Sequence, residues 1–474
     1  MSQIPLSLTR RQFGMGLGGW AIASRLFGAA PSMPWMTPAT VRKVYLAVPQ
    51  PTWPRPDLDV RKEQAGLEAV LAAVERRHAG EVRFTGGDLL RTVEDAQAFV
   101  KGLQDVDGVL IVDLTSGTSG MLRALREIPV PVLLFARPYS GWSYVDVVEW
   151  ARSGKKADLL VSSEPGDLDP YLRMFRTVHH LRTSKVLVVG PGAGRSQITE
   201  AFTRQFGTAF AFPEYRDLQA AFDAADPAQA QKAAAEFTRG ALKVVEPAPA
   251  EITAALRFYH GVANLLERER ANAITIDCLG GFKRGDLPAY PCVAWSKLND
   301  QGLYGVCEAD VLSTMTQLLL TSFSGKPGFV SDPVFDTSRN EIIHAHCVAA
   351  TAMLGIGGAT SPYLIRSHME DNKGVSMQVV LPIQETITVA KFLDARSFAI
   401  SSGEVLGNVD DPRGCRSKIR TRVANARRLL EGYSGGLHRV IVYGDYVTPV
   451  ERMGRLMGFQ VVREGEDRPA QRAI

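Results

Sequence analysis

The 474-residue chain lacks the features that mark several large classes of protein. It has no long basic block and a net charge of only +4, which argues against nucleic acid as a partner. Its five cysteines are an odd number without CxxC spacing, which argues against a disulfide framework and a zinc ribbon. No internal repeat or low-complexity tract is visible. What remains, 45% hydrophobic and 22% charged residues, is typical of a globular protein with two or three domains.

Two adjacent arginines near the start of the chain predict export. Arg10 and Arg11, followed by Phe13, precede a weakly apolar, glycine-rich run from Gly14 to Ser24. This layout is typical of a twin-arginine signal, which addresses proteins for export already folded, and the run is too short to span a bilayer. We therefore expect residues 1–40 to be a signal and linker, the twin-arginine export machinery to be a partner, and the protein to be periplasmic or otherwise extracytoplasmic. The alternative is a cytoplasmic N-terminus with a chance Arg-Arg pair.

Short apolar runs then alternate with helical patterns. The runs predict strands at Val41–Val48, Val106–Leu114, Val130–Phe135, Leu159–Val161 and Lys185–Val189. Such alternation is typical of parallel sheets with helices on both faces. From about residue 379, short alternating stretches broken by Gly, Asp and Pro predict a smaller β-rich domain. We therefore predict an α/β fold with two N-terminal α/β (Rossmann-like) domains, 41–183 and 184–375, and a β-rich C-terminal domain, 376–474.

Two loops follow predicted strands, at Leu114–Gly120 and Gly190–Gly194. In open α/β sheets, ligands gather at such strand ends. Neither loop is a nucleotide fingerprint, because the second is not GxGxxG and no Gly-Lys-Ser/Thr follows it. We interpret both as ordinary strand-to-helix turns. The alternative is that Thr115, Ser116 and Thr118 offer hydroxyls to a polyol ligand.

The densest group of chemically competent residues lies in the C-terminal half. Glu308 stands at, or just before, the start of a predicted helix from Val311 to Leu320, and Asp332 ends a predicted short strand. An acid at a helix start can be merely a favourable partner of the helix dipole, or it can be aimed into a cleft. Both interpretations stay open for each acid taken alone.

Histidines accompany these acids. His344 and His346 fall on one face of a predicted strand, His368 follows, and His438 stands at the entrance to another strand. A lone histidine is usually a satisfied polar residue, but two carboxylates and an imidazole form a mixed O/N ligand set. Oxygen-rich ligation suits Mn²⁺ or Mg²⁺ better than a thiolate site would. From the residues alone, a metal site and a set of structural residues are equally open.

The order of the motifs resembles that of the L-fucose/L-arabinose isomerase superfamily. The segments that carry the resemblance are Cys307–Asp310, Phe329–Asp332, His344–Cys347, Gly414–Lys418, Leu437–Arg439 and Tyr443–Asp445. The specific motifs lie within 275–445, and the N-terminal part matches only in its general α/β pattern. The match is to a divergent, exported branch rather than to a close copy of either sugar isomerase.

The resemblance implies a divalent metal held by two acids and one late histidine. Matched residue by residue, these are Glu308, Asp332 and His438, with Mn²⁺ as the favoured metal and Mg²⁺ or Co²⁺ as alternatives. His346 matches a histidine near the metal in the arabinose branch. The family also forms trimers or hexamers, so the resemblance implies a homo-oligomer.

The activity that the resemblance implies is aldose–ketose isomerisation, or epimerisation, through an enediol. The two acids would flank the C1–C2 bond and move a proton between these carbons, with the individual roles of Glu308 and Asp332 unassigned. His344, His346, His368 and Lys297 are the candidate substrate-binding residues.

Two other functions stay open. The first is a different metal-dependent carbohydrate enzyme on the same scaffold, such as a lyase, a hydratase or a glycoside-cleaving enzyme. The second is a non-catalytic periplasmic sugar-binding protein, in which sugar binding would survive Glu308→Gln and Asp332→Asn. The sequence leaves the identity of the sugar open.

Overall fold

The computed structural model describes residues 33–191, 194 and 196–466 of the chain. The predicted export motif therefore lies outside the described residues. The chain divides into two compact units. Unit 2 is formed by Met33–Thr183 with Thr448–Gln460, and unit 1 by the rest.

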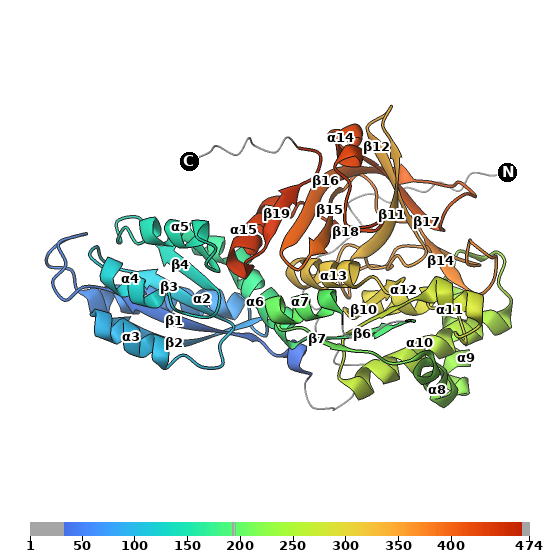
Figure 1. The fold of residues 1–474 in the computed structure, drawn as a ribbon, viewed down its shortest axis with the longest axis horizontal. Coiled ribbons are helices and arrows are strands. Elements are labelled where there is room, and N and C mark those ends of the chain that lie inside the picture. Colours follow the sequence, from blue (N-terminus) through green and yellow to red (C-terminus); the bar gives the residue numbers. More distant parts are fainter. Residues whose placement is uncertain (1–32, 192–193, 195, 467–474) are drawn as a thin grey trace. The chain divides into compact units, whose positions relative to one another are not determined.

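Unit 2 is built on a five-stranded parallel sheet (Figure 1). Its strands, in spatial order, are β2 (Val82–Leu90), β1 (Ala39–Leu46), β3 (Gly108–Asp113), β4 (Val132–Ala136) and β5 (Ala157–Val161). Its helices are α2 (Val60–Arg77), α3 (Val93–Lys101), α4 (Ser119–Leu125), α5 (Tyr144–Arg152), α6 (Asp169–Thr183) and α15 (Val447–Met457). Apolar residues of α3, α4 and α5 form a core against one face of the sheet, and α2 and α6 contact strands β1 and β2. Strand β1 lies beside β3, and β2 lies on the outer side of β1. The gap between β1 and β3 is therefore the topological switch point of the sheet.

Two segments of unit 2 differ from the sequence-based expectation. Strand β2 was not predicted, because it is an edge strand with exposed alternate residues and a bulge at Gly86 and Gly87, so its apolar pattern is weak. Residues 34–36 form a 3₁₀ turn in which Trp35 is buried, and β1 begins at Ala39. Residues 33–40, which the sequence analysis assigned to the signal and linker, are therefore part of unit 2.

Unit 1 begins with a four-stranded parallel sheet. In spatial order its strands are β10 (Tyr304–Cys307), β9 (Ala273–Ile276), β6 (Lys185–Val189) and β7 (Ala209–Ala211). The accompanying helices are α7 (Gln197–Phe206), α8 (Tyr215–Ala224), α9 (Pro227–Gly240), α10 (Pro249–Glu269), α11 (Cys278–Arg284), α12 (Cys292–Asp300) and α13 (Val311–Ser324).

A seven-stranded sheet, antiparallel from β15 to β16, completes the core of unit 1. Its order is β15 (Thr386–Asp394), β18 (Arg439–Tyr443), β11 (Phe329–Asp336), β12 (Glu341–His346), β17 (Ser417–Arg422), β16 (Ser397–Asn408) and β19 (Gln460–Arg463). A small sheet holds β14 (Ser376–Val379), β13 (Tyr363–Arg366) and β8 (Lys243–Val244), and α14 spans Ala426–Glu431. Helix α13 carries no charged residue, is buried along most of its length, and lies between the parallel and the antiparallel sheet (Figure 1).

These observations confirm the predicted fold class: parallel α/β regions followed by an antiparallel β-rich region. In chain order the first strand of the antiparallel sheet is β11, so residues 329–346 share a sheet with strands that begin 40 or more residues further along the chain. All five cysteines are free thiols, and four of them are buried.

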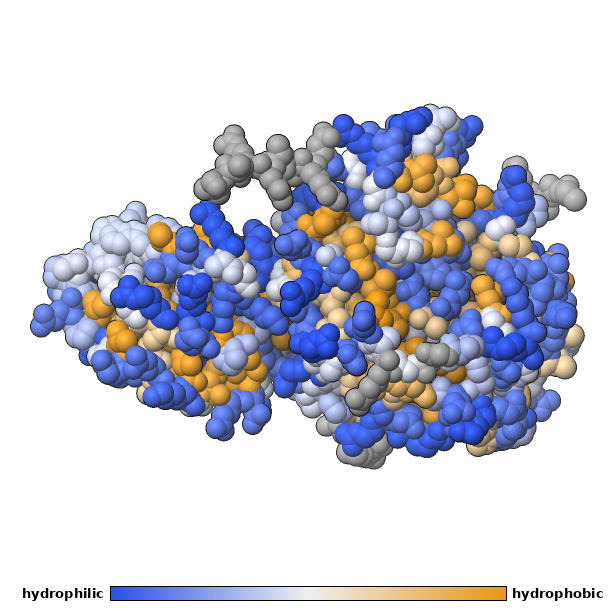
Figure 2. All heavy atoms as spheres, viewed as in Figure 1, coloured by the Kyte–Doolittle hydropathy of each residue, from blue (hydrophilic) through white to orange (hydrophobic). Residues whose placement is uncertain are grey.

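Among the described residues, no helix combines the length and the apolar character that a membrane crossing requires. On the face drawn in Figure 2, hydrophilic side chains predominate and apolar ones form scattered patches.

Candidate metal centre

The register of the antiparallel sheet brings Asp332 and His438 together. Strand β11 pairs with β18 through Ser331 and Arg439, so the next position of the ladder sets Asp332 beside His438. On its other side, β11 pairs with β12 through Asp332 and Ala345, which precedes His346. Asp332, His346 and His438 therefore meet on neighbouring strands, although they are separate in sequence.

Glu308 reaches this point from the parallel sheet. It follows β10 and, with Ala309, adopts a left-handed backbone conformation, with φ of 65° and 51°. Such a conformation costs a residue other than glycine on the order of 1–3 kcal/mol and is concentrated at functional sites. Hydrogen bonds from the Ala309 amide to Ile276 and from the Asp310 amide to Cys307 hold the turn. Asp310 then caps the start of α13.

The four side chains form what we call the carboxylate–histidine cluster: Glu308, Asp332, His346 and His438. Nε2 of His438 lies 3.4 Å from Oδ1 of Asp332 and 3.5 Å from Oε2 of Glu308. Nε2 of His346 lies 4.0 Å from Oε1 of Glu308. The carboxylates are 35% and 26% exposed, for Glu308 and Asp332, whereas both imidazoles are buried. Solvent therefore reaches the cluster from the carboxylate side.

Asp310 orients His438. Nδ1 of His438 lies 2.9 Å from Oδ2 of Asp310, which also accepts a hydrogen bond of 2.7 Å from Lys391. Burial alone would raise the pKa of Asp310, but the hydrogen bonds from His438 and Lys391 lower it overall. An ionised carboxylate only accepts, so Nδ1 of His438 carries a proton. This carboxylate–histidine pair is the arrangement that orients metal-binding imidazoles in proteins.

His346 has the opposite hydrogen-bonding pattern. Its Nδ1 accepts a hydrogen bond of 2.9 Å from the amide of Cys347. Burial lowers the pKa of His346 to about 3, so the ring is neutral and its proton is on Nε2. Although Glu308, His346 and His438 are close enough to hold a metal as a triplet, a protonated Nε2 offers no lone pair. His346 is therefore better suited to donate a hydrogen bond to an oxygen atom.

The two carboxylates of the cluster differ in acidity. The hydrogen bond with His438 is the main reason why the pKa of Glu308 lies below its usual value. Burial, and the negative charges of Glu308 and Glu370, raise the pKa of Asp332 to about 6. Burial opposes protonation of His438, but hydrogen bonds to Asp310 and Glu308 raise its pKa to about 9. The cluster is thus electrostatically coupled, as expected of an active site.

The residues fit a divalent cation. Among the residues that the structure describes, the buried Oδ1 of Asp332 has no hydrogen-bond partner of good geometry, and Nε2 of His438 has only its long contacts with the two carboxylates. The two atoms lie 3.4 Å from each other, and buried polar atoms without a good partner cost free energy. Carboxylate oxygens and one imidazole nitrogen are ligands that Mn²⁺, Mg²⁺ and Co²⁺ accept. Glu308 and Asp332, two of the metal ligands implied by the resemblance, thus each lie within 3.5 Å of Nε2 of the third, His438.

The other candidate residues have contacts elsewhere. Nδ1 of His344 lies 3.1 Å from the hydroxyl of Ser331, and burial lowers the pKa of His344 to about 3. The ring of His368 packs on Tyr290, 5.3 Å between centroids, and Nδ1 lies 3.5 Å from Asp371.

Lys297 also has its contacts elsewhere. It lies over the rings of Phe237 and Tyr259, at 5.3 and 5.8 Å, and burial lowers its pKa. The structure brings His346 into the cluster, but it gives His344 and Lys297 no contact with it.

The sequence analysis did not single out Asp310 and Lys391. Asp310 lies within the Cys307–Asp310 motif, but its contact with His438 depends on tertiary structure. Lys391 is only 2% exposed in a strand of apolar residues, and burial lowers its pKa. A lysine within such an apolar strand is the signal that could have indicated a buried ion pair.

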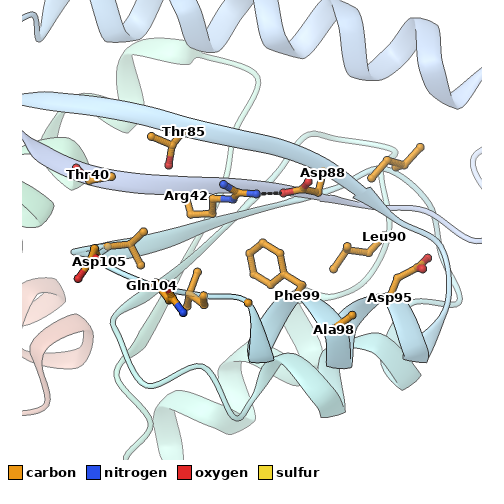
Figure 3. Close-up of a pocket in the computed structure, with 14 residues that line it drawn as sticks. Thr40, Arg42, Thr85, Asp88, Leu90, Asp95, Ala98, Phe99, Gln104 and Asp105 are labelled. Carbon is orange, nitrogen blue, oxygen red and sulfur yellow. Dashed lines mark hydrogen bonds and ion pairs between the residues drawn. The ribbon is translucent and has the colours of Figure 1, made fainter.

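Unit 2 contains a separate pocket of about 560 Å³, lined by β1, β2, α3 and the loop after α3. Arg42 and Asp88, joined by an ion pair of 2.6 Å, lie opposite Phe99 and Ala98 (Figure 3). Two further acids line the pocket, Asp105 and Asp95, which accepts from the amide of Thr92, but its lining contains no histidine.

Comparison with known proteins supports a sugar isomerase-like function through distant similarity. The chain matches no family model. It is 23% identical over 403 residues to the sulfoquinovose isomerases of Priestia aryabhattai and of Priestia megaterium. Each alignment covers 78% of this chain and 89% of the relative. The similarity thus spans both units rather than one local motif.

Proposed function

We propose that the protein is a metal-dependent sugar isomerase-like enzyme that interconverts an aldose and a ketose, or two epimers, through an enediol. The observation that carries this proposal is the convergence of Glu308, Asp332 and His438, with a proton-donating His346 beside them. The distant similarity to sulfoquinovose isomerases supports the same reaction class.

Glu308, Asp332 and His438 would hold the metal, favoured as Mn²⁺. When bound, a divalent cation polarises adjacent sugar oxygens as a Lewis acid and orients the substrate. Asp310 and Lys391 act behind this set, because they keep Nδ1 of His438 protonated and its Nε2 directed at the two acids.

The chain's own groups account for the proton movements. One carboxylate of the Glu308–Asp332 pair takes the proton from the carbon next to the carbonyl, and the pair returns a proton to the neighbouring carbon, while the hydroxyl proton of the first carbon passes to the former carbonyl oxygen. Nε2–H of His346 donates a hydrogen bond to a substrate oxygen and stabilises the charge that develops there. The strained turn at Glu308 and Ala309 fixes the position of the first acid against the strands that carry the others.

Export and assembly are further parts of the proposal. The arginine pair at Arg10 and Arg11 supports transport by the twin-arginine machinery to an extracytoplasmic site. The resemblance of the motifs supports a homo-oligomer. Prefolded export suits an enzyme that must acquire its metal before it leaves the cytoplasm.

The test combines metal analysis with proton exchange in D₂O over a panel of aldoses that includes sulfoquinovose. We expect exchange at the carbon next to the carbonyl, its loss on chelation, and its recovery with Mn²⁺. Glu308→Gln should lower the rate by about 10²-fold or more and keep the circular dichroism spectrum, since it removes a ligand and a base without changing size.

The matched control is Glu404→Gln, which changes an exposed carboxylate of the antiparallel sheet that contains Asp332. This variant should behave like the wild type. Normal turnover by Glu308→Gln would refute the assignment of the site.

A further inference from the structure

Unit 2 holds another pocket, which collects arginine side chains. It has a volume of about 390 Å³ and is lined by residues of α5, α6, α15 and the edge strand β5, all of which belong to this unit. Arg152 comes from the end of α5, and Arg452 and Arg455 come from α15. We call this cavity the arginine pocket.

The lining of the arginine pocket is positively charged. Asp158 is its one carboxylate, so three arginines and one aspartate give a formal net charge of +2. Oδ1 of Asp158 lies 3.1 Å from Nε of Arg455. Within the described part of the chain, Arg452 contacts a tyrosine hydroxyl instead of a carboxylate, and Arg152 has no ion pair. Two of the three positive charges are therefore left without a counter-ion.

Two buried polar side chains hold the arginines of α15 in place. Tyr171 is 1% and Asp158 4% exposed. The Tyr171 hydroxyl accepts a hydrogen bond of 3.1 Å from Nη1 of Arg452 and donates one of 3.2 Å to Asp158. Arg455 donates from Nε and Nη2 to the two oxygens of Asp158, at 3.1 and 3.3 Å. Because these partners are fixed in the core, the guanidinium groups lose less conformational freedom when a ligand binds.

Folding alone does not account for this concentration of like charge. Arg152 and Arg455 stand in the last turns of their helices, where the helix dipole favours a cation, but Arg452 lies in the middle of α15. Arg452 and Arg455 are three residues apart, so they share one face of the helix and repel each other. A bound anion would remove this repulsion, and the pocket therefore points to an anionic ligand.

The shape and charge of the pocket favour a phosphate monoester. Guanidinium groups bind phosphate oxygens through paired hydrogen bonds. A phosphate monoester carries a charge of about −1.5 to −2 at pH 7, which matches the formal charge of the lining. Val148, Ala151 and Leu159 add apolar side chains to the walls, which suit an organic group attached to the phosphate.

We propose that the arginine pocket binds a phosphate monoester. The phosphate group lies between Arg152 and Arg452, and the organic group contacts the apolar wall. The site contains no residue of the carboxylate–histidine cluster, and the proposal does not depend on the isomerase function.

The test is calorimetric titration of the full chain, loaded with Mg²⁺, with phenyl phosphate at low ionic strength. We expect binding that weakens as NaCl is added, because salt screens the arginine charges. Inorganic phosphate should bind more weakly, since it lacks the apolar group. Phenyl sulfate should also bind more weakly, since it carries only one negative charge.

Substitutions locate the binding. Arg152→Gln and Arg452→Gln should each weaken phenyl phosphate binding roughly fivefold, because each removes a charged donor. Arg452→Lys keeps the charge and should lose less affinity than Arg452→Gln, even if the glutamine variant folds poorly. The matched control is Arg61→Gln, which changes an exposed arginine of α2 in the same unit that donates to Gln64. This variant should bind like the wild type.

Glu308→Gln separates this site from the metal centre. A phosphate held by the metal would be lost in this variant, whereas a phosphate in the arginine pocket would bind as in the wild type. The proposal would be overturned by a wild type that does not bind phenyl phosphate, by unchanged affinity in Arg452→Gln, by an equal loss in Arg61→Gln, or by loss of binding in Glu308→Gln. Equal affinity for inorganic phosphate and phenyl phosphate would overturn the choice of an ester.

Discussion

The two histidines of the cluster differ in which ring nitrogen is free. His438 donates from Nδ1 to Asp310, so Nε2 is the nitrogen that would give up its proton to bind a metal, whereas His346 accepts at Nδ1 and has its proton on Nε2. A metal needs a lone pair, and a developing negative charge on a substrate oxygen needs a donor. The backbone and side-chain partners of each ring therefore assign it a different task.

We expect this difference to separate metal affinity from turnover. His438→Gln should weaken Mn²⁺ binding at least tenfold, because it removes a ligand. His346→Gln should keep metal affinity within about threefold and lower kcat/KM by about 10²-fold, the usual contribution of a positioned donor. Calorimetric titration with Mn²⁺ and steady-state kinetics give the two quantities.

His368→Gln is the control for a histidine of the same half of the chain, and it should leave the metal affinity unchanged. If His346→Gln loses the metal as fully as His438→Gln, then His346 is itself a ligand and our assignment of its proton is wrong.

At the scale of elements, the turn between β10 and α13 is the unusual feature. Glu308 and Ala309 are consecutive left-handed residues, and neither is glycine. The turn delivers an acid from the parallel sheet to strands of the antiparallel sheet, while Asp310 caps α13 and orients His438 in the same step. Strain here is offset by the fully buried helix that follows.

Replacement of Ala309 by glycine tests this strain. Because glycine adopts positive φ freely, Ala309→Gly should be neutral or stabilise the fold by up to about 1 kcal/mol, after subtraction of the entropy that glycine adds to the unfolded state. The same change in the exposed interior of α9, Ala235→Gly, should destabilise by about 1 kcal/mol. Denaturant unfolding measures both. Equal destabilisation by the two variants would show that Ala309 is not strained.

At the scale of the whole molecule, each unit has its own core and its own buried charges. In unit 2, Asp107 is only 2% exposed and binds Nδ1 of His179 at 3.0 Å, Arg182 at 2.7 Å and the amide of Thr40 at 2.8 Å. Burial would raise the pKa of Asp107, but these three partners lower it overall. The group links the first strand of the unit, β1, to helix α6.

This network predicts how the stability of unit 2 depends on pH. Since the pKa of folded Asp107 lies below the unfolded value of about 3.9, its contribution is complete above that pH and is lost as the pH falls through the folded pKa. Asp107→Asn should therefore lower the free energy of unfolding by about 2–3 kcal/mol at pH 7. This value is at the low end for a buried ion pair because the Arg182 side chain is half exposed, and solvent screens its charge. The difference from wild type should narrow below about pH 4.

Circular dichroism with denaturant at pH 7, 4 and 3 provides the measurement. Asp105→Asn, an exposed neighbour with a positive φ that asparagine tolerates, is the control and should match the wild type. A loss of stability for Asp107→Asn that is the same at every pH would contradict the assignment.

The local elements of this protein follow from its sequence. Strand β6 occupies Lys185–Val189 and helix α13 begins at Val311, as the apolar runs predict, because a buried strand or helix needs a continuous or periodic set of apolar residues. The same argument fails for β2, where the edge position and the glycine bulge remove the pattern. The residue types of the metal-site candidates were also readable, since their order resembles that of a known family.

Only the tertiary structure decided how these candidates act together. The pairing of β11 with β18 sets Asp332 beside His438, and pairing between strands distant along the chain leaves no local signal. The hydrogen bonds of Asp310 and Cys347 assign the ring protons of His438 and His346, and they depend on where each backbone and carboxylate comes to lie. The chemistry available to this chain was thus visible in its residues, whereas their geometry arose from contacts that form only when both sheets of unit 1 are assembled.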